Sequence, residues 1–120
     1  MKFIFSTLIV RNMEESLKFY KEIVGLKENR RFQAGPGEEI VFLGEEQTQI
    51  ELICKGQNKD IDIGKDISWA FEVKSLDKMM ELVKEKGIDI YSGPFSPNPH
   101  VKFFCVLDPS GFKIQFVENM

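Results

Sequence analysis

The spacing of apolar residues changes several times along the first half of the chain, between patterns typical of strands and of a helix. Residues 2–10 are rich in β-branched and aromatic side chains, which predicts a strand. The apolar positions that follow recur at helical spacing; they are Met13, Leu17, Tyr20 and Val24. Asn12 is placed to cap this helix and Gly25 to end it. Three further strands are expected at 26–33, 39–43 and 48–54, with a turn at 34–37.

The second half repeats this order after a polar linker at 55–66. A strand is expected at 67–73, followed by a helix that Ser75 caps and Gly87 ends. The apolar stripe of that helix is Leu76, Met79, Met80 and Val83. A short strand is expected at 88–91, a proline-rich loop at 92–99, and two strands at 101–107 and 112–118 around the turn at 108–111.

The two halves match in element order and in apolar phase. Val10 and Val73 are 63 positions apart, and Leu43 and Leu107 are 64 apart, as are Ile50 and Ile114. This repeat predicts a single α+β domain over 1–120, with module one at 1–54, the linker at 55–66 and module two at 67–120. Each module is a βαβββ unit, and together they are expected to form a cupped mixed sheet with the helices on its outer side.

The composition narrows the possible partners. The 120 residues are 42% hydrophobic and 29% charged, which is typical of a folded domain. A net charge of −3 without a basic cluster makes nucleic acid an unexpected partner. No apolar run is long enough to span a membrane and no export signal begins the chain, so we expect a cytoplasmic protein. Cys54 and Cys105 are expected to be free thiols.

Three segments of the chain resemble one known superfamily. They are NMEESLKFYKEIVGLKE, ISWAFEV and FFCVLDPSGFKIQFVE. They are similar to the glyoxalase/bleomycin resistance/dioxygenase proteins, also called the vicinal oxygen chelate superfamily. The resemblance implies paired βαβββ modules, a cupped sheet that holds a ligand, and a homodimer. The superfamily includes lyases, dioxygenases, epimerases, transferases and non-catalytic drug binders, so the resemblance is more informative on fold than on chemistry.

The resemblance also identifies four positions at which metal-using members place their ligands. In this chain those positions hold Phe5, Glu51, Ser68 and Gln115. Only Glu51 is a strong metal ligand, and the single histidine of the chain, His100, lies at none of them. Glutathione-dependent glyoxalase I enzymes carry an arginine where this chain has Ile9 and a glutamate base where it has Gln115. No cofactor is therefore expected, and one divalent metal remains the alternative.

Side-chain alternation places further polar groups on the same strand faces as these four positions. The predicted ligand-binding residues are Phe5, Thr7, Gln49, Glu51, Ser68, Lys113 and Gln115. Glu51 is the candidate catalytic or anchoring group, Gln115 an amide donor and Phe5 a stacking platform. The structural alternative is a solvated sheet face or a dimer contact. His100 is expected at the surface, and the loop 92–99 is a candidate flap over the ligand.

Three functions are compatible with these residues. The first is a metal-free protein that binds a small organic molecule, of the drug-sequestering or sensing kind. The second is a metal-dependent lyase or isomerase of the lactoylglutathione lyase type that uses Glu51. The third is an interaction module without a small ligand, whose sheet face is filled by side chains. A homodimer is expected for all three.

Overall fold

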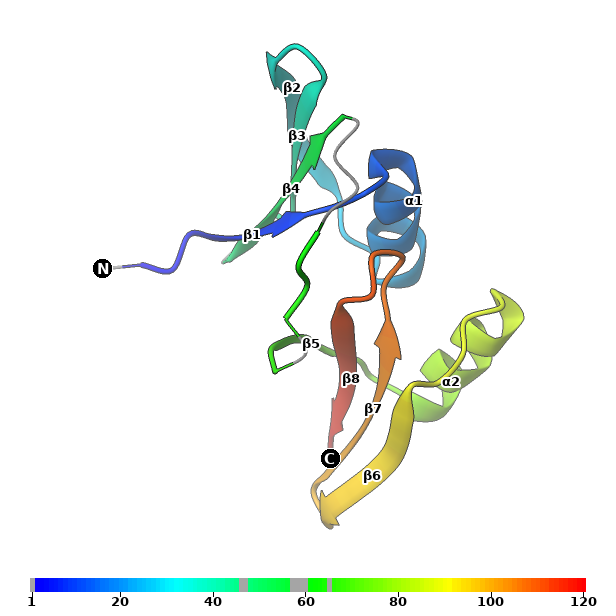
Figure 1. Ribbon diagram of the computed structural model, residues 1–120. Coiled ribbons are helices and arrows are strands. Elements are labelled where there is room, and N and C mark those ends of the chain that lie inside the picture. Colours follow the sequence, from blue (N-terminus) through cyan, green and yellow to red (C-terminus); the bar gives the residue numbers. More distant parts are fainter. Residues whose placement is uncertain (1, 46–47, 57–60, 65) are drawn as a thin grey trace. The chain divides into compact units, whose positions relative to one another are not determined.

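The computed structural model describes residues 2–45, 48–56, 61–64 and 66–120. The chain divides into two compact units, Met1–Asp62 and Ile63–Met120 (Figure 1). Each unit contains a strand, a helical segment and three more strands in that order, which confirms the predicted α+β fold of repeated βαβββ modules. Within the predicted linker at 55–66, Lys55 belongs to a strand and residues 57–60 and 65 lie outside the described residues.

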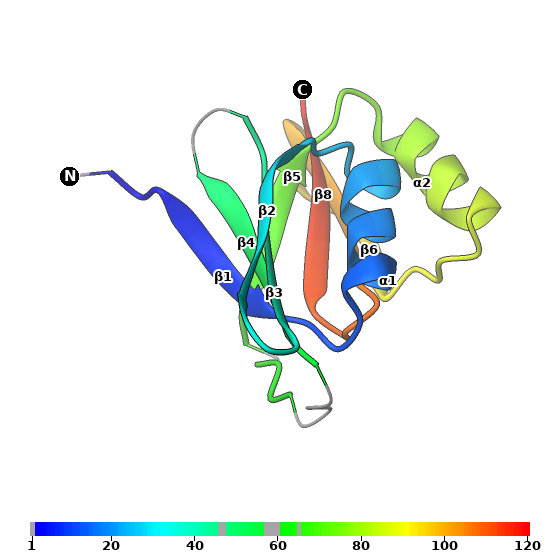
Figure 2. The ribbon, with the colours of Figure 1, turned by 90° about the horizontal axis from the view of Figure 1, so that it is seen from above.

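Unit 1 forms a four-stranded mixed sheet. Its elements are β1 (Phe5–Ile9), α1 (Met13–Lys18), the π-helix η1 (Phe19–Ile23), β2 (Glu28–Gly35), β3 (Glu38–Leu43) and β4 (Gln49–Lys55). The strand order is β1-β4-β3-β2, in which β1 runs parallel to β4 and the other pairs are antiparallel (Figure 2). The parallel pair joins the first and last strands of the unit, and the helical segment, β2 and β3 lie between them along the chain.

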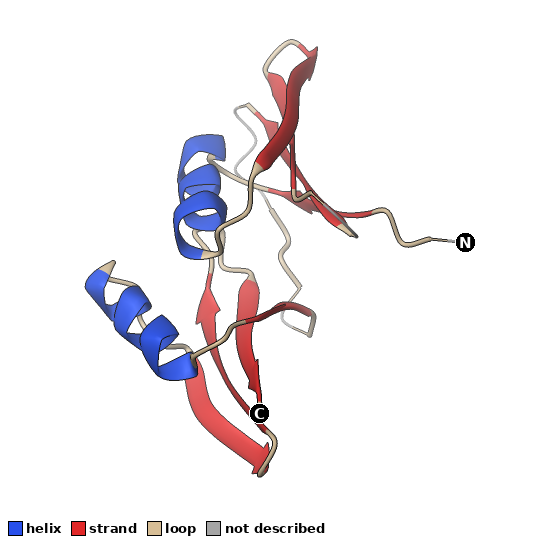
Figure 3. Cartoon of the chain, turned by 180° about the vertical axis from the view of Figure 1, so that it is seen from behind, coloured by secondary structure: helices blue, strands red, loops and turns tan. Residues whose placement is uncertain are grey.

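Unit 2 repeats this topology. Its elements are β5 (Ser68–Glu72), α2 (Leu76–Glu85), β6 (Ser92–Asn98), β7 (Val101–Leu107) and β8 (Lys113–Asn119). The strand order is β5-β8-β7-β6, with β5 parallel to β8. In each unit the helical segment lies on one side of the strands (Figure 3), where α1 packs against β4 and α2 against β8.

The core of each unit lies between the sheet and its helix. In unit 1 the fully buried side chains include Tyr20 of the helical segment and Val41, Leu43 and Leu52 of the strands. In unit 2 they include Val83 of α2 together with Phe104, Ile114 and Phe116. In β4 and β8 the buried residues alternate with less buried ones, as the strand period predicts. In β3 and β7 three consecutive residues are buried.

The first helix departs from the predicted period. Asn12 caps it as expected, since its side chain accepts a hydrogen bond from the backbone N–H of Glu15. After Lys18 the helix widens into η1, and Val24 N–H bonds to the carbonyl of Phe19, five residues back. A π turn holds more residues than an α turn, which rotates the later positions. Phe19 and Ile23 are therefore buried, whereas Val24 is half-buried.

The second helix follows its pattern more closely. Ser75 caps α2 by accepting from the N–H of Lys78 at 3.2 Å, and Gly87 follows the helix with a φ of +75°. Leu76, Met79 and Val83 are buried as predicted.

The strand at 88–91 and the loop at 92–99 were predicted wrongly. Residues 88–91 lie outside any strand, and 92–98 form β6. β6 is an edge strand that pairs only with β7, at Ser92, Phe95 and Asn98 with register shifts between them. Prolines are tolerated on such a strand because only one of its sides has to supply donors. The flap predicted at 92–99 is therefore part of the sheet.

The strand register also corrects the alignment of the repeat. Leu43 pairs with Ile50 in unit 1, and Val106 pairs with Ile114 in unit 2. The repeat equivalent of Leu43 is therefore Val106, which is fully buried like Leu43, and Leu107 is 39% exposed. Strand boundaries differ as well. For example, β1 begins at Phe5, since residues 2–4 lie outside any strand, and β2 continues into the predicted turn as far as Gly35.

The helices of the described residues include none that is both long and apolar enough to cross a membrane.

Candidate functional site

In unit 1 the predicted site residues share the sheet face that points away from α1. Phe5 lies opposite Gln49, and Thr7 lies opposite Glu51, in the parallel register of β1 and β4. Residues directly opposite one another project to the same side of a sheet. All four are exposed or half-buried, whereas their strand neighbours Leu8, Ile50 and Leu52 are buried. We call this surface the open face of unit 1.

Glu51 and Thr7 form the polar centre of this face. The Thr7 hydroxyl Oγ1 donates a hydrogen bond to Glu51 Oε1 at 2.6 Å. This bond is the only one of the Glu51 carboxylate within the described part of the chain. The second carboxylate oxygen, Oε2, can therefore accept a hydrogen bond from a ligand.

The pairing of β3 and β2 adds two residues that are not in the predicted ligand-binding set. Phe42 lies opposite Glu51, and Arg30 lies opposite Phe42. The Phe42 ring meets Phe5 edge-on at 5.4 Å between centroids, and the Arg30 guanidinium carbon stands 4.2 Å from its centroid. Thr7, Glu51, Phe42 and Arg30 thus form one row across the four strands of unit 1. The signal that locates Phe42 and Arg30 is the strand register, which the alternation of apolar and polar residues does not determine.

In unit 2 the predicted residues again share the face opposite the helix. Ser68 lies opposite Lys113, and Ala70 lies opposite Gln115. The Gln115 amide Nε2 donates to Ser68 Oγ at 3.2 Å. The next cross-strand neighbour of Gln115 is Cys105, a buried free thiol. We call this surface the open face of unit 2.

A family model decides the relationship of this chain to known proteins. The model of the Glyoxalase/Bleomycin resistance protein/Dioxygenase superfamily matches residues 3–116. The chain belongs to this superfamily. The predicted resemblance is thereby confirmed, and so is the fold that it implied.

Individual members of the superfamily resemble the chain over nearly its whole length. A lactoylglutathione lyase of Neisseria meningitidis is 31% identical over 127 aligned residues, which cover 99% of this chain and 91% of the relative. The trypanothione-dependent glyoxalase I of Leishmania major superposes with a TM-score of 0.85 at 20% identity, covering 98% and 86% of the two chains. A glyoxalase family protein of Bacillus anthracis gives a TM-score of 0.76 at 22% identity, covering 100% and 96%. At these identities the solved structures show the shared fold.

The donor set at the superfamily's metal positions does not fit a transition metal. Glu51 offers one carboxylate that already accepts a hydrogen bond from Thr7, and Phe5 packs edge-on against Phe42. The Gln115 amide turns its nitrogen, a donor, toward the Ser68 hydroxyl. Neutral amide and hydroxyl oxygens are weak ligands for the metals that imidazole and carboxylate hold. Three His, Cys, Asp or Glu side chains do not come together as a metal site anywhere in the described ranges.

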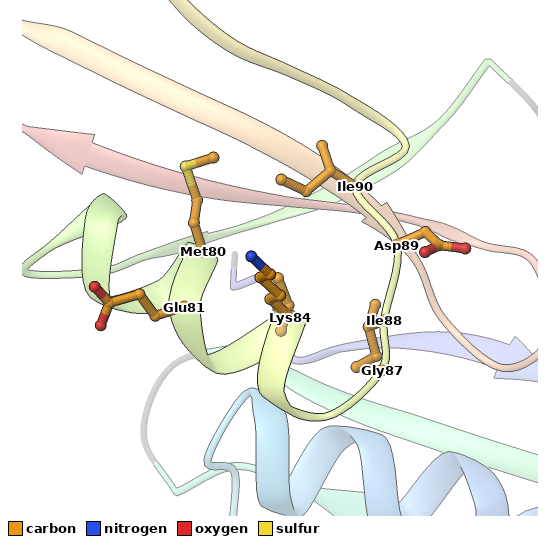
Figure 4. Close-up of a pocket in the computed structure, with 8 residues that line it drawn as sticks. Met80, Glu81, Lys84, Gly87, Ile88, Asp89 and Ile90 are labelled. Atoms are coloured by element: carbon orange, nitrogen blue, oxygen red, sulfur yellow. The ribbon is translucent and has the colours of Figure 1, made fainter.

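A pocket of about 430 Å³ lies elsewhere in unit 2, between α2 and the segment that follows it. It is lined by Met80, Glu81 and Lys84 of α2 and by Ile88, Asp89 and Ile90 of the following segment (Figure 4). None of the predicted ligand-binding residues lines this pocket. His100 is exposed after β6, as predicted, and its backbone N–H donates to Asn98 Oδ1 at 2.8 Å.

Proposed function

We propose that this protein binds a small organic molecule on the open faces of its sheets without a resident metal ion. The observation that carries the proposal is the pair of internal hydrogen bonds, Thr7 to Glu51 and Gln115 to Ser68. They place polar groups that can still donate or accept among apolar side chains, as in sites for small organic ligands. The chemistry at the four metal positions supports binding through hydrogen bonds and apolar contact.

The test is a binding measurement with and without a chelator. We expect mass spectrometry of the natively purified protein, or a thermal-shift screen of small organic compounds, to find a ligand. Its affinity, measured by calorimetry, should be the same in EDTA as in buffer with added Zn²⁺ or Ni²⁺. Glu51→Gln and Gln115→Leu should each weaken binding about tenfold, since each removes a polar contact to the ligand. A ligand that binds only with metal would contradict the proposal.

The second candidate is a metal-dependent lyase that uses Glu51 as catalytic group. The 31% identity to a lactoylglutathione lyase favours it. It predicts one tightly held divalent ion per chain by elemental analysis, and hemithioacetal turnover that Glu51→Gln abolishes. Absence of both the ion and the turnover in freshly purified protein would leave the binding protein as the function.

We further propose a cytoplasmic homodimer. Each sheet has two strands with an unpaired edge, β1 and β2 in unit 1 and β5 and β6 in unit 2. Open edges are frequently covered by pairing with a second chain. Light scattering coupled to size exclusion should give twice the 13.9 kDa mass of the chain. A monomer at micromolar concentration would contradict this assembly and leave the binding proposal standing.

A further inference from the structure

We propose that Arg30 anchors the carboxylate of the ligand, so that unit 1 selects aromatic carboxylates over neutral molecules of the same shape. This inference rests on the proposed function and adds the chemical class of the ligand. Arg30 projects from β2 onto the open face of unit 1, in the same cross-strand row as Phe42 and Glu51.

The guanidinium of Arg30 is held by rings and by no carboxylate of the described residues. Its carbon Cζ lies 4.2 Å from the centroid of Phe42 and 5.7 Å from that of Phe32. Its interactions in the described part of the chain are these two ring contacts. Among the described residues, no carboxylate therefore pairs with the positive charge of Arg30.

The neighbouring Arg31 shows what a structural arginine looks like in the same strand. Its Nε donates to Glu39 at 2.7 Å, and its Nη2 donates to Glu14 of α1, also at 2.7 Å. The hydrogen bonds that Arg31 donates to Glu39 and Glu14 raise the pKa of Arg31 above its ordinary value. Arg31 thus links the helix to the sheet, on the side away from the open face. Its Nε and Nη2 donors already bind carboxylates of the protein, unlike those of Arg30.

Stacking on a ring occupies the flat face of a guanidinium and leaves its N–H donors pointing outward in the plane. Those donors match a carboxylate in a bidentate geometry. Phe42 is 3% exposed and Phe32 is 43% exposed, so an aromatic ligand could cover the exposed ring while its carboxylate meets Arg30. The same side chains then supply both the apolar contact and the charge.

Glu51 determines which way round a ligand lies on this face. It lies opposite Phe42 on the strand beyond, and it forms no ion pair with Arg30. A ligand carboxylate near Glu51 is repelled by the like charge, whereas one near Arg30 is attracted. The carboxylate of the ligand is therefore expected at β2, and any hydroxyl or amine of the ligand at Glu51.

The test compares 2-naphthoate with 2-naphthamide, two probes that share a ring system and differ in charge. Calorimetry on the full chain should show naphthoate binding to the wild-type protein roughly tenfold more tightly than naphthamide. Arg30→Gln should remove this preference, mainly by weakening the binding of naphthoate. Arg31→Gln and Lys27→Gln change the net charge by the same amount and should retain the preference. Circular dichroism and thermal melts verify that each variant is folded.

Side-chain NMR supplies a second readout in the wild-type protein. The Arg30 Nε–H resonance, assigned by its loss in Arg30→Gln, should shift on titration with naphthoate and stay in place with naphthamide. The assignment of Arg30 is overturned if the two probes bind the wild type equally, if neither binds, or if Arg30→Gln keeps the preference. Small-molecule binding itself fails only if the thermal-shift screen and the mass spectrometry of the purified protein also find no ligand.

Discussion

Glu118, near the end of β8, accepts a hydrogen bond from the backbone N–H of Leu76, the first residue of α2, at 2.6 Å. The last strand of unit 2 thus caps the helix that the unit's first strand leads into. At the equivalent place in unit 1 stands Cys54, whose thiol donates to the carbonyl of Arg11 at 3.6 Å. Only unit 2 has a carboxylate at the positive end of its helix in this position.

This contact predicts a graded loss of stability. Glu118→Gln keeps an acceptor oxygen and loses the charge, whereas Glu118→Ala loses both. We expect the alanine variant to lower the free energy of unfolding by about 1–2 kcal/mol and the glutamine variant by less. Urea denaturation measures both. Glu85→Gln, at the opposite end of α2, should be neutral or slightly stabilising, because a negative charge there opposes the helix dipole. Equal losses at Glu118 and Glu85 would contradict the capping role.

Ser16 offers a stabilising substitution. Its side chain is fully buried in α1, and its hydroxyl oxygen has no hydrogen-bond partner in the described structure. A buried unsatisfied hydroxyl is unfavourable, and alanine has the higher helix propensity. Ser16→Ala should therefore raise the unfolding free energy by about 1 kcal/mol, measured by the shift of the urea midpoint at constant slope. A clear destabilisation would show that the hydroxyl does find a partner.

Glu28 gives a prediction on pH. The hydrogen bond from Lys21 Nζ, at 2.8 Å, holds the pKa of Glu28 below its ordinary value, and the charge of Arg31 adds to this effect. A carboxyl with a lowered folded-state pKa stabilises the fold above its unfolded pKa. That contribution is lost as the pH falls through the lowered value. Because the pair is solvent-exposed, we expect up to about 0.5 kcal/mol.

Carbon-detected NMR titration of the Glu28 carboxyl measures this directly. Lys21→Gln should raise the pKa of Glu28 and flatten the loss of stability in acid. Lys18→Gln, one helical turn earlier and without a contact to Glu28 among the described residues, is the matched control. A pKa of Glu28 that does not respond to Lys21→Gln would rule out the hydrogen bond as its main cause.

Alanine substitutions at Gly93 and Gly87 distinguish the cost of backbone strain from that of steric conflict. Both have positive φ, +92° and +75°. A Cβ on Gly93 would lie 3.0 Å from the carbonyl oxygen of Phe103 and 3.1 Å from Phe104 Cα, whereas one on Gly87 would meet nothing within 4 Å. Gly87→Ala should cost about 1 kcal/mol and Gly93→Ala about 2–3 kcal/mol, since β6 must also move away from β7. Thermal denaturation of the two variants checks the order.

Local sequence signals were enough to predict the element order. The capping residues Asn12 and Ser75 and the glycines that end the helices act through their own neighbours, so they can be found without tertiary information. The alternation along β4 and β8 likewise separated buried from open faces, because a strand places successive side chains on opposite sides.

The errors occurred where distant contacts decide. The widening of the helix at Phe19 depends on what the helix packs against. The apolar spacing alone therefore wrongly predicted that Val24 is buried. The prolines of 92–99 are compatible with a strand only because β6 lies at an edge, a fact of topology. Arg30 and Phe42 were left out of the predicted ligand-binding set for a related reason. Their place beside Glu51 depends on the register of two antiparallel pairs, and a shift of one residue would move both to the other face.

The parallel pairing of the first and last strands of each unit has a consequence for folding. The hydrogen bond between Thr7 and Glu51 joins residues 44 positions apart in the sequence, and the one between Gln115 and Ser68 joins residues 47 positions apart. Neither sheet can be completed by hairpins alone, because each needs a long loop to close before its outer strand gains a partner. During synthesis on the ribosome, β1 must therefore wait for β4 to emerge, and β5 for β8.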